Sequence, residues 1–195
     1  MLRKQIVLVV DLGGVVIDKY ATDLRGMRYS RGDPELPEVT HAFEALRELA
    51  DMGITIYMLS SGGSEATGRR TRWLRARNFE GRTGIPWSNV KFCGSRHDKR
   101  WWCKVLRATH IVDDRREVLL AMPRKRELYL YLFRPALDAQ MKYLAEGKPV
   151  PELGPEVRTA DAWTDLELMI RADIEEACGL STLTDMARWS EEEGE

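Results

Sequence analysis

Residues 5–18 read QIVLVVDLGGVVID, an apolar run that ends abruptly in a carboxylate, Asp11, followed by the glycines Gly13 and Gly14. A strand that is apolar on both faces is typical of the centre of a parallel sheet. Open α/β sheets bind ligands at the carboxyl ends of such strands. Glycines at this turn let backbone amides approach a bound anion closely. The stretch therefore predicts a buried strand that carries Asp11 to a ligand-binding edge, although turns after strands favour Asp and Gly in any case.

The chain has 195 residues, which suits one full domain with a sizeable core and is short for two. Its 30 basic and 31 acidic residues give a formal net charge of -1, so no global field favours nucleic acid or a membrane. The cysteines number 3 and lack zinc-site spacing, which favours a reducing compartment over a disulfide framework. The first apolar run is too short to span a bilayer and lacks a signal-peptide pattern. We expect a single cytoplasmic domain over residues 1–180, with an acidic tail at 181–195.

Predicted strands and helices alternate along the chain. Further apolar strands are expected at 54–59, 90–93, 110–112 and 127–133. Helices are expected between them at 37–52, 64–79, 98–108 and 116–122. This alternation predicts the fold class α/β, as a Rossmann-like three-layer α/β/α domain whose central sheet is mostly parallel.

Two of these helices carry more detailed expectations. Residues at helical spacing in the helix 98–108 are expected to pack inward, namely Trp101, Trp102, Val105 and Leu106. The arginines of the helix 64–79 are interpreted as a solvated face, opposite an inner side of Trp73, Leu74 and Phe79. The last third predicts a helix from 134 to about 146, an irregular proline-rich stretch, an edge strand at 157–160 and a helix at 162–178.

Polar side chains gather at three predicted strand ends. In chain order they are Asp11, then Ser60 with Ser61 and Gly62, then the pair Asp113 and Asp114. Two adjacent acids at a buried strand end are costlier than a helix cap requires, and they repel each other unless a cation lies between them and Asp11. We therefore favour metal binding over capping for Asp113 and Asp114. A lysine, Lys99, opens the helix that precedes this strand.

This set of residues resembles the motifs of the haloacid dehalogenase superfamily, in the same order, over residues 6–133. In that family the first strand supplies a nucleophilic Asp, the second a Ser or Thr, a Lys precedes the fourth strand, and acids at the end of that strand hold magnesium. The resemblance implies that Asp11, Ser60 and Lys99 are catalytic. Lys104 is an alternative to Lys99, which is preferred for its spacing before the strand and its place at the helix start. The substrate-binding residues that the resemblance implies are Ser60, Ser61, Gly62 and Lys99.

The resemblance further implies a Mg²⁺-dependent phosphatase. Asp11 would attack phosphorus and form an aspartyl-phosphate. Magnesium prefers near-octahedral oxygen ligands, and here they would be Asp11, the backbone carbonyl of Gly13, and Asp113 or Asp114.

One position departs from the family pattern. The usual family phosphatase has a second Asp two residues after the nucleophile, acting as general acid and base, and this chain has Gly13 there. Some relatives do carry Asp-x-Gly-x-Val at this motif. A general acid contributes about two to four powers of ten in rate, so its loss weakens a phosphatase without removing the nucleophile. Asp18, or an acid of the segment 19–36, is a candidate substitute. The second function hypothesis is therefore a catalytically weak or inactive protein that binds a phosphorylated ligand or protein.

Family enzymes for small metabolites usually carry a cap domain that closes over the site and excludes water. Here the segment 19–36 is too short for a separate domain, and 62–90 offers one helix and a turn. We expect a capless protein with a short cap loop at 19–36 and an open site for a phosphorylated substrate, small or macromolecular. Nucleic-acid ends are a less favoured substrate that the arginine helix suggests, and no membrane partner is expected. An open site that lacks its general acid predicts faster turnover of an aryl phosphate than of an alkyl phosphate.

Overall fold

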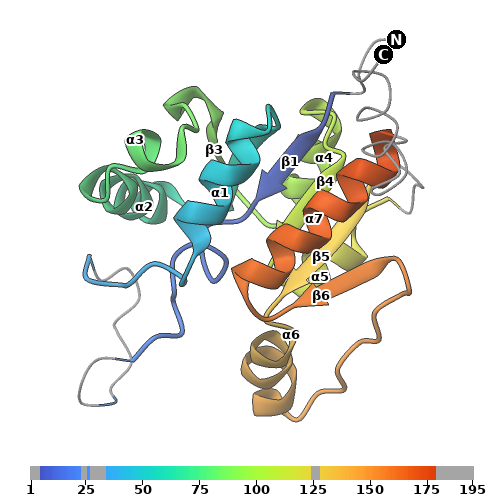
Figure 1. The fold of residues 1–195 in the computed structure, drawn as a ribbon. Helices are drawn as coiled ribbons and strands as arrows, with labels where there is room; N and C mark the ends of the chain where they lie inside the picture. The colour runs from blue at the N-terminus through green and yellow to red at the C-terminus, as the bar shows by residue number, and fades with distance from the viewer. Residues whose placement is uncertain (1–4, 23–25, 27–33, 124–127, 179–195) are drawn as a thin grey trace, which may run out of the picture.

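The computed structural model describes residues 5–22, 26, 34–123 and 128–178. They form a six-stranded parallel sheet in the order β3-β2-β1-β4-β5-β6, with helices on both faces (Figure 1). The strands are β1 (Val7–Val10), β2 (Thr55–Ser61), β3 (Val90–Cys93), β4 (His110–Asp113), β5 (Tyr129–Phe133) and β6 (Val157–Ala160). The three-layer α/β fold predicted from the alternation is confirmed.

β1 lies at the centre of the sheet, between β2 and β4, and all of its residues are buried. Its register pairs Val10 with Met58 of β2 and with Val112 of β4. Successive residues of a strand point to opposite faces of the sheet. Val9 and Ile111 therefore belong to one half of the core, and Val10 and Val112 to the other.

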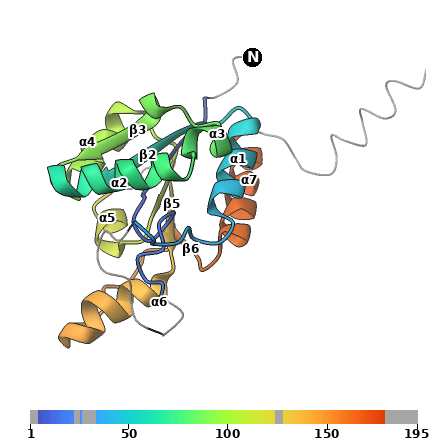
Figure 2. The same ribbon diagram turned by 90° about the vertical axis from the view of Figure 1, so that its left-hand side faces the viewer.

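Helices cover the two faces in separate layers. They are α1 (Ala42–Asp51), α2 (Ser64–Ala76), α3 (Phe79–Thr83), α4 (Asp98–Val105), α5 (Arg116–Leu120), α6 (Pro135–Asp138) and α7 (Trp163–Cys178). α1 and α7 share a core half through Phe43 and Trp163, whereas α4 and α5 contribute Cys103 and Leu119 to the other. Figure 2 shows the two layers edge-on, with α1 and α7 on one side of the sheet and α4 and α5 on the other.

Two of the predicted helices differ most from the observed ones. The helix expected at 37–52 begins only at Ala42, because His41 has a left-handed backbone conformation with φ 63°. The helix expected at 64–79 divides into α2 and α3, because Asn78 between them is also left-handed, with φ 50°. The inner side chains predicted for this region are buried, namely Trp73, Leu74 and Phe79.

The inward face of α4 was predicted incorrectly. Trp101 and Val105 are 58% and 51% exposed, so they do not pack into the core. The residues of α4 that are buried are Lys99 and Cys103, which lie one helical turn apart. The predicted residues that do contact the core are Trp102 and Leu106. α4 thus turns a lysine toward the sheet, and an ordinary apolar pattern does not reveal this.

The last third agrees with the prediction. The helix expected from 134 to 146 is present as α6 followed by the helical segments η2 (Ala139–Tyr143) and η3 (Leu144–Glu146). The proline-rich stretch has no helix or strand, and β6 lies at the sheet edge. α7 buries residues at helical spacing, namely Trp163, Leu166, Ile170 and Ile174. The predicted tail at 181–195 and much of the segment 19–36 lie outside the described residues. None of the helices in the described part of the chain is long and apolar enough to cross a membrane.

Candidate active site

Asp11 and Asp113 meet at the carboxyl ends of β1 and β4 because the two strands are neighbours in register. Val10 pairs with Val112, and the amide of the next residue, Asp11, donates to the Val112 carbonyl over 3.0 Å. Alternation turns the side chains of Asp11 and Asp113 toward the face that α4 covers. From α4, Lys99 reaches both carboxylates, with Nζ 2.7 Å from Asp11 Oδ1 and 2.6 Å from Asp113 Oδ2. Lys104, the sequence alternative to Lys99, is exposed.

Burial and nearby charges shift the pKa values of Asp11 and Asp113, the two carboxylates that Lys99 contacts, in opposite directions. Burial opposes ionisation of Asp11, but the charges of Lys99, Lys19 and Arg70 outweigh it and hold the pKa of Asp11 below its usual value. Burial, together with the charges of Asp11 and Asp114, raises the pKa of Asp113 to about 7 against the effect of Lys99. The pKa of Lys99 is raised: burial lowers it, and the charges of Asp11 and Asp113 more than offset that loss. Asp11 is therefore held as a carboxylate, which is the form that a nucleophile needs.

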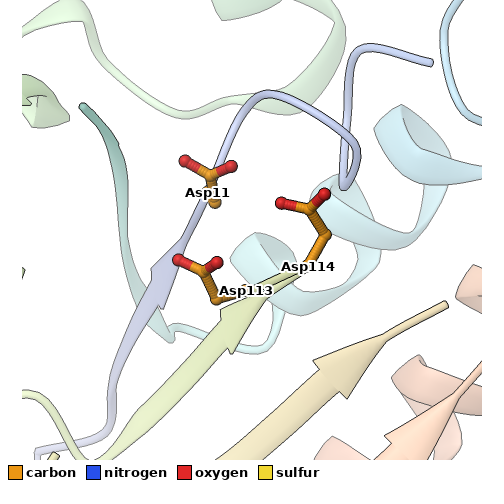
Figure 3. A group of neighbouring side chains, drawn as sticks. All are labelled: Asp11, Asp113 and Asp114. Carbon is orange, nitrogen blue, oxygen red and sulfur yellow. The ribbon is translucent and has the colours of Figure 1, made fainter. Parts of the chain in front are cut away.

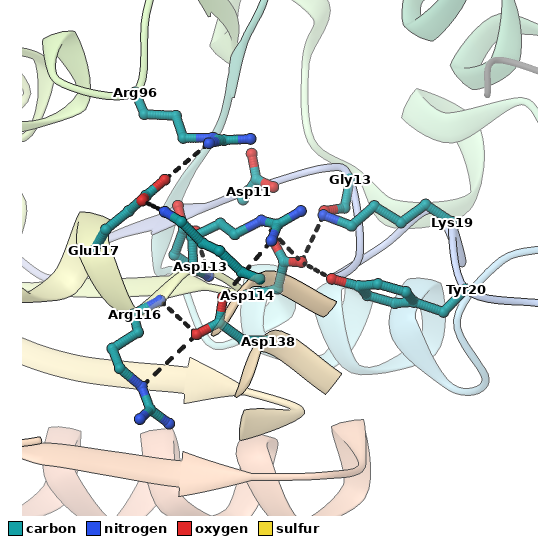
Figure 4. Close-up of polar contacts among 12 residues, drawn as sticks. Asp11, Gly13, Lys19, Tyr20, Arg96, Asp113, Asp114, Arg116, Glu117 and Asp138 are labelled. Carbon is teal, nitrogen blue, oxygen red and sulfur yellow. Dashed lines mark hydrogen bonds and ion pairs between the residues drawn. The ribbon is translucent and has the colours of Figure 1, made fainter. Parts of the chain in front are cut away.

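Asp114 lies on the other side of this group and has its own cation. Lys19 Nζ is 2.6 Å from Asp114 Oδ2 and donates a 2.8 Å hydrogen bond to the carbonyl oxygen of Gly13. The hydroxyl of Tyr20 donates to the same Asp114 oxygen over 2.8 Å (Figure 4). Gly14 has φ +98°, and a Cβ there would overlap the Asp114 carboxylate and approach Lys19 Cε to 2.9 Å. The second glycine of the motif is thus required by the close approach of Asp114 to the turn.

The three carboxylates suit a divalent cation. One oxygen from each of Asp11, Asp113 and Asp114 lies within 4.8 Å of the others, and all three residues are buried (Figure 3). Asp114 Oδ1 is buried and, within the described residues, accepts no hydrogen bond. An all-oxygen set of this kind, with the nearby Gly13 carbonyl, matches the preference of Mg²⁺. The residues present therefore fit the metal that the resemblance implies.

The structure separates Ser60 from Ser61, which were both predicted to bind substrate, with Ser60 also predicted to be catalytic. β2 continues through both, two residues past the predicted end of the strand, so they point to opposite faces. Ser60 is fully buried, is absent from the cavity wall, and its Oγ has no hydrogen-bond partner among the described residues. Ser61 lines the cavity beside Asp11. At this strand end Ser61 therefore borders the cavity, whereas Ser60, the predicted catalytic residue, lies on the other face of the sheet.

The other predicted residue of this turn, Gly62, also lies in the cavity wall. Its backbone amide already donates to the carbonyl of Cys93 over 3.0 Å. Gly62 therefore forms part of the cavity wall, while its amide hydrogen bonds to β3 and not to a ligand. The candidate substitute acid Asp18 is absent from the wall and pairs with Arg134 at 3.0 Å.

A cavity of about 800 Å³ opens above the carboxylates. The sequence interpretation missed several of its cations, since it assigned all the arginines of α2 to a solvated face. Arg70 lines the cavity, donates to the carbonyl of Ser61 over 2.6 Å, and contributes to the low pKa of Asp11. The sequence signal was available, because Ala66, Arg70 and Trp73 are spaced by four and three residues on one helix face. Lys19 and Tyr20 also line the cavity, and no periodic pattern marks them.

Several solved structures share this fold. A D,D-heptose 1,7-bisphosphate phosphatase from B. bronchiseptica, complexed with magnesium and phosphate, superposes with a TM-score of 0.59 at 13% identity, over 87% of this chain and 99% of that one. The corresponding phosphatase from Burkholderia thailandensis gives 0.56 at 12% identity, over 86% and 99%. A protein described as a haloacid dehalogenase-like hydrolase, from Burkholderia xenovorans, gives 0.54 at 14%, over 86% and 97%.

The chain has a haloacid dehalogenase-like fold. No protein-family model and no curated protein matches it in sequence. At these identities the likeness shows the haloacid dehalogenase-like fold alone, and the chemistry has to be argued from the side chains at its strand ends.

Proposed function

We propose that this chain is a Mg²⁺-dependent phosphatase that acts through an aspartyl-phosphate on Asp11. The observation that carries the proposal is the buried Lys99, whose ammonium joins Asp11 to Asp113 at the ends of two central strands. Burying three charged groups together costs several kcal/mol per ion unless they compensate one another, so such a group indicates a site rather than a packing detail. The magnesium and phosphate in the B. bronchiseptica phosphatase, which shares the fold, are consistent with it.

The residues have complementary roles in the proposed reaction. An oxygen of the ionised Asp11 carboxylate attacks phosphorus, the bond from phosphorus to the ester oxygen breaks, and that oxygen leaves with the electron pair. Lys99, Arg70 and the Ser61 hydroxyl donate hydrogen bonds to the phosphoryl oxygens as charge develops there. Water then attacks the aspartyl-phosphate, which releases phosphate and restores Asp11. Mg²⁺, held by Asp11, the Gly13 carbonyl and Asp113 or Asp114, would supply charge neutralisation of the phosphoryl group.

Gly13 supports a second candidate function, a catalytically weak or inactive protein that binds a phosphorylated ligand or protein. A Cβ at Gly13 would lie 3.7 Å from Arg70 Nη2 and 3.9 Å from Lys19 Cδ, so the usual position of the general acid lies between two basic side chains. They are suited to binding a phosphate, but not to acting as a carboxylic acid that protonates a leaving group. We propose a single domain with 19–36 as a short cap loop and with a phosphorylated ligand, small or macromolecular, in the cavity that Lys19, Tyr20 and Leu36 of this segment line.

Hydrolysis of an aryl phosphate, measured with and without Mg²⁺, tests the proposal. Asp11→Asn keeps the side-chain shape but removes the nucleophile and a metal-facing charge, so we expect it to abolish turnover while circular dichroism stays unchanged. Asp165→Asn, an exposed position in α7, is the matched control and should retain full activity. Turnover that survives in Asp11→Asn rejects the aspartyl-phosphate mechanism. No turnover by the natural chain, with phosphate binding retained, favours the second candidate.

A further inference from the structure

One face of α2 forms a long wall of the cavity. The α2 residues in this wall are Ala66, Arg69, Arg70, Arg72, Trp73 and Ala76. A helix rises about 1.5 Å per residue, so the wall from Ala66 to Ala76 extends about 15 Å from the end near the carboxylates. The distance is greater than a phosphoryl group alone requires. The cavity therefore has room for the rest of a substrate along α2.

Charge along this wall is of one sign. The acidic residues of the cavity, within the described part of the chain, are the three carboxylates at the strand ends. Outside them the charged wall residues are all basic. Lys19 and Lys99 pair with the carboxylates of the site itself. Arg96 pairs with Glu117 at 2.8 Å, and Arg115 approaches Asp138 to 3.6 Å.

The arginines of α2 are used differently from one another. Arg70 belongs to the reaction centre, since it binds the Ser61 carbonyl and contributes to the low pKa of Asp11. Arg69 pairs with Glu65, whose side chain is 88% exposed, so water screens that pair strongly. Arg72 is exposed, and no ion pair joins it to another described residue. Residues 69, 72 and 76 lie along one flank of the helix, at spacings of three and four.

An apolar part of the cavity wall joins α2 to the loop before α1. Trp73 Nε1 donates a 2.8 Å hydrogen bond to the carbonyl of Leu36, which joins the helix to the loop before α1. Ile17, Leu36 and Trp73 line this part of the cavity. A ligand in the cavity would have one anionic end at Asp11 and Lys99, a carbon skeleton against these apolar side chains, and its second anionic end at Arg69 and Arg72.

We infer that the substrate is a small phosphomonoester with a second anionic group, bound by Arg69 and Arg72 on the flank of α2 beside Arg70. This inference rests on the proposed function only in calling the ligand a substrate, because the ligand could bind in the same way without being hydrolysed. Arginine binds phosphate and carboxylate through paired, charge-assisted hydrogen bonds, so either group suits the second anionic end.

Binding of non-hydrolysable ligands tests the inference. α,ω-Alkane bisphosphonates of three to eight carbons would be compared by calorimetry with the alkyl monophosphonates of equal length, at a fixed excess of Mg²⁺. An ω-phosphonocarboxylate series distinguishes a carboxylate from a phosphate at the second anionic end. For at least one length we expect the bis-anion to bind at least about tenfold tighter, since each charge-assisted hydrogen bond contributes about that factor or more.

Two variants of α2 separate specific binding from general attraction. Arg69→Gln with Arg72→Gln should remove the preference for the bis-anion and leave monophosphonate binding within about twofold. Arg75→Gln removes a charge from the same helix but lies outside the cavity wall, with its guanidinium 5.6 Å from the Trp87 ring centre, and should retain the preference. Equal affinity for both series at every length overturns the inference, as does an equal loss in Arg75→Gln. Failure of aryl phosphate hydrolysis with the preference intact would instead reject the proposed phosphatase.

Discussion

Two lysines contact the acidic residues of the site, and their surroundings differ. Lys99 projects from α4, is 3% exposed, and joins Asp11 to Asp113. The side chain of Lys19 comes from the loop after β1, is 29% exposed, and joins the Gly13 carbonyl to Asp114. The first ammonium cannot leave without exposing two buried carboxylates to each other. The second can move to solvent, because more of its side chain already contacts water.

The difference assigns the two lysines separate functions. Lys99 compensates buried charge permanently, so we expect it to matter for the folded state as much as for the proposed reaction. Lys19 contacts two of the oxygens proposed for Mg²⁺, so it occupies part of the coordination space and must move or share these oxygens when a metal enters. Substitutions at both lysines, and at the residues that they contact, measure this difference.

The largest effect is expected at Lys99. Lys99→Met leaves Asp11 and Asp113 as uncompensated buried acids, which costs about 3–5 kcal/mol of the free energy of unfolding. Lys19→Met should cost less than about 2 kcal/mol, because Tyr20 still donates a hydrogen bond to Asp114. Urea denaturation at neutral pH measures both, with Lys104→Met as an exposed control on α4. Equal losses at Lys99 and Lys19 would contradict the distinction.

Removing the acids at the end of β4 should abolish metal binding. Asp113→Ala with Asp114→Ala deletes two of three carboxylates, so we expect Mg²⁺ affinity to fall at least about 100-fold, as hard cations depend on anionic oxygen ligands. Calorimetric titration with Mg²⁺ gives the affinity, and the two single variants show which acid contributes more. Asp161→Ala, an exposed position before α7, should bind as the natural chain does. Unchanged binding in the double variant would locate the metal elsewhere.

The adjacent serines provide a matched pair. Ser61→Ala should lower kcat/KM about 100-fold, as loss of one preorganised donor does in other sites. Ser60→Ala should leave kcat/KM nearly unchanged and should not lower the free energy of unfolding, because the Oγ of Ser60 makes no hydrogen bond within the described residues. Initial rates with an aryl phosphate give both values. A larger loss at Ser60 than at Ser61 would make Ser60 the serine that binds the phosphoryl group.

These serines show how far the sequence predicts the site. Asp11 and the Asp113–Asp114 pair were predictable, because a carboxylate at the end of a buried apolar run is costly unless a cation or a ligand compensates it. A strand end can be predicted only within a few residues, and one residue reverses the face on which a side chain lies. Ser60 was therefore predicted to bind substrate together with Ser61, whereas Ser61 alone of the two lines the cavity.

The helices that carry lysine and arginine were harder to interpret. The inward face of α4 was missed because its buried lysine is compensated by acids from distant strands, which no local pattern contains. Arg70 was missed because arginines occur on several faces of α2, so the sequence does not distinguish the arginine that faces the cavity from those that face solvent. The role of Lys19 depends on the path of a loop, and loop paths have no periodic signal.

The position of Lys19 also predicts a measurable effect on the affinity for Mg²⁺. A unit charge about 4 Å from another contributes about 4 kcal/mol at an effective dielectric constant of about 20, but Lys19 can move toward solvent and avoid most of this repulsion. We therefore expect Lys19→Gln to tighten Mg²⁺ binding about tenfold, with Lys104→Gln unchanged. Calorimetry on the two variants checks this. Weaker binding in Lys19→Gln would mean that Lys19 organises the site for the metal instead of competing with it.

The smallest effect is expected at Gly13, although a general acid there normally contributes about two to four powers of ten. A Cβ at this position has ordinary contacts with Arg70 and Lys19, so the Cβ of Gly13→Asp clashes with neither side chain. The same two cations favour the ionised form of the new carboxyl and lower its pKa, and an ionised carboxylate has no proton to give.

The natural chain should hydrolyse an aryl phosphate faster than an alkyl phosphate, because it supplies little acid catalysis to a poor leaving group. Gly13→Asp should narrow this ratio of kcat/KM values by less than about tenfold, and Gly13→Asp with Lys19→Gln should narrow it further, since one of the two cations is gone. If Gly13→Asp alone narrowed the ratio of kcat/KM values by about two to four powers of ten, Arg70 and Lys19 would have to move away from the new carboxyl group. No change in either variant would mean that another group already protonates the leaving oxygen, or that the reaction is not phosphate-ester hydrolysis.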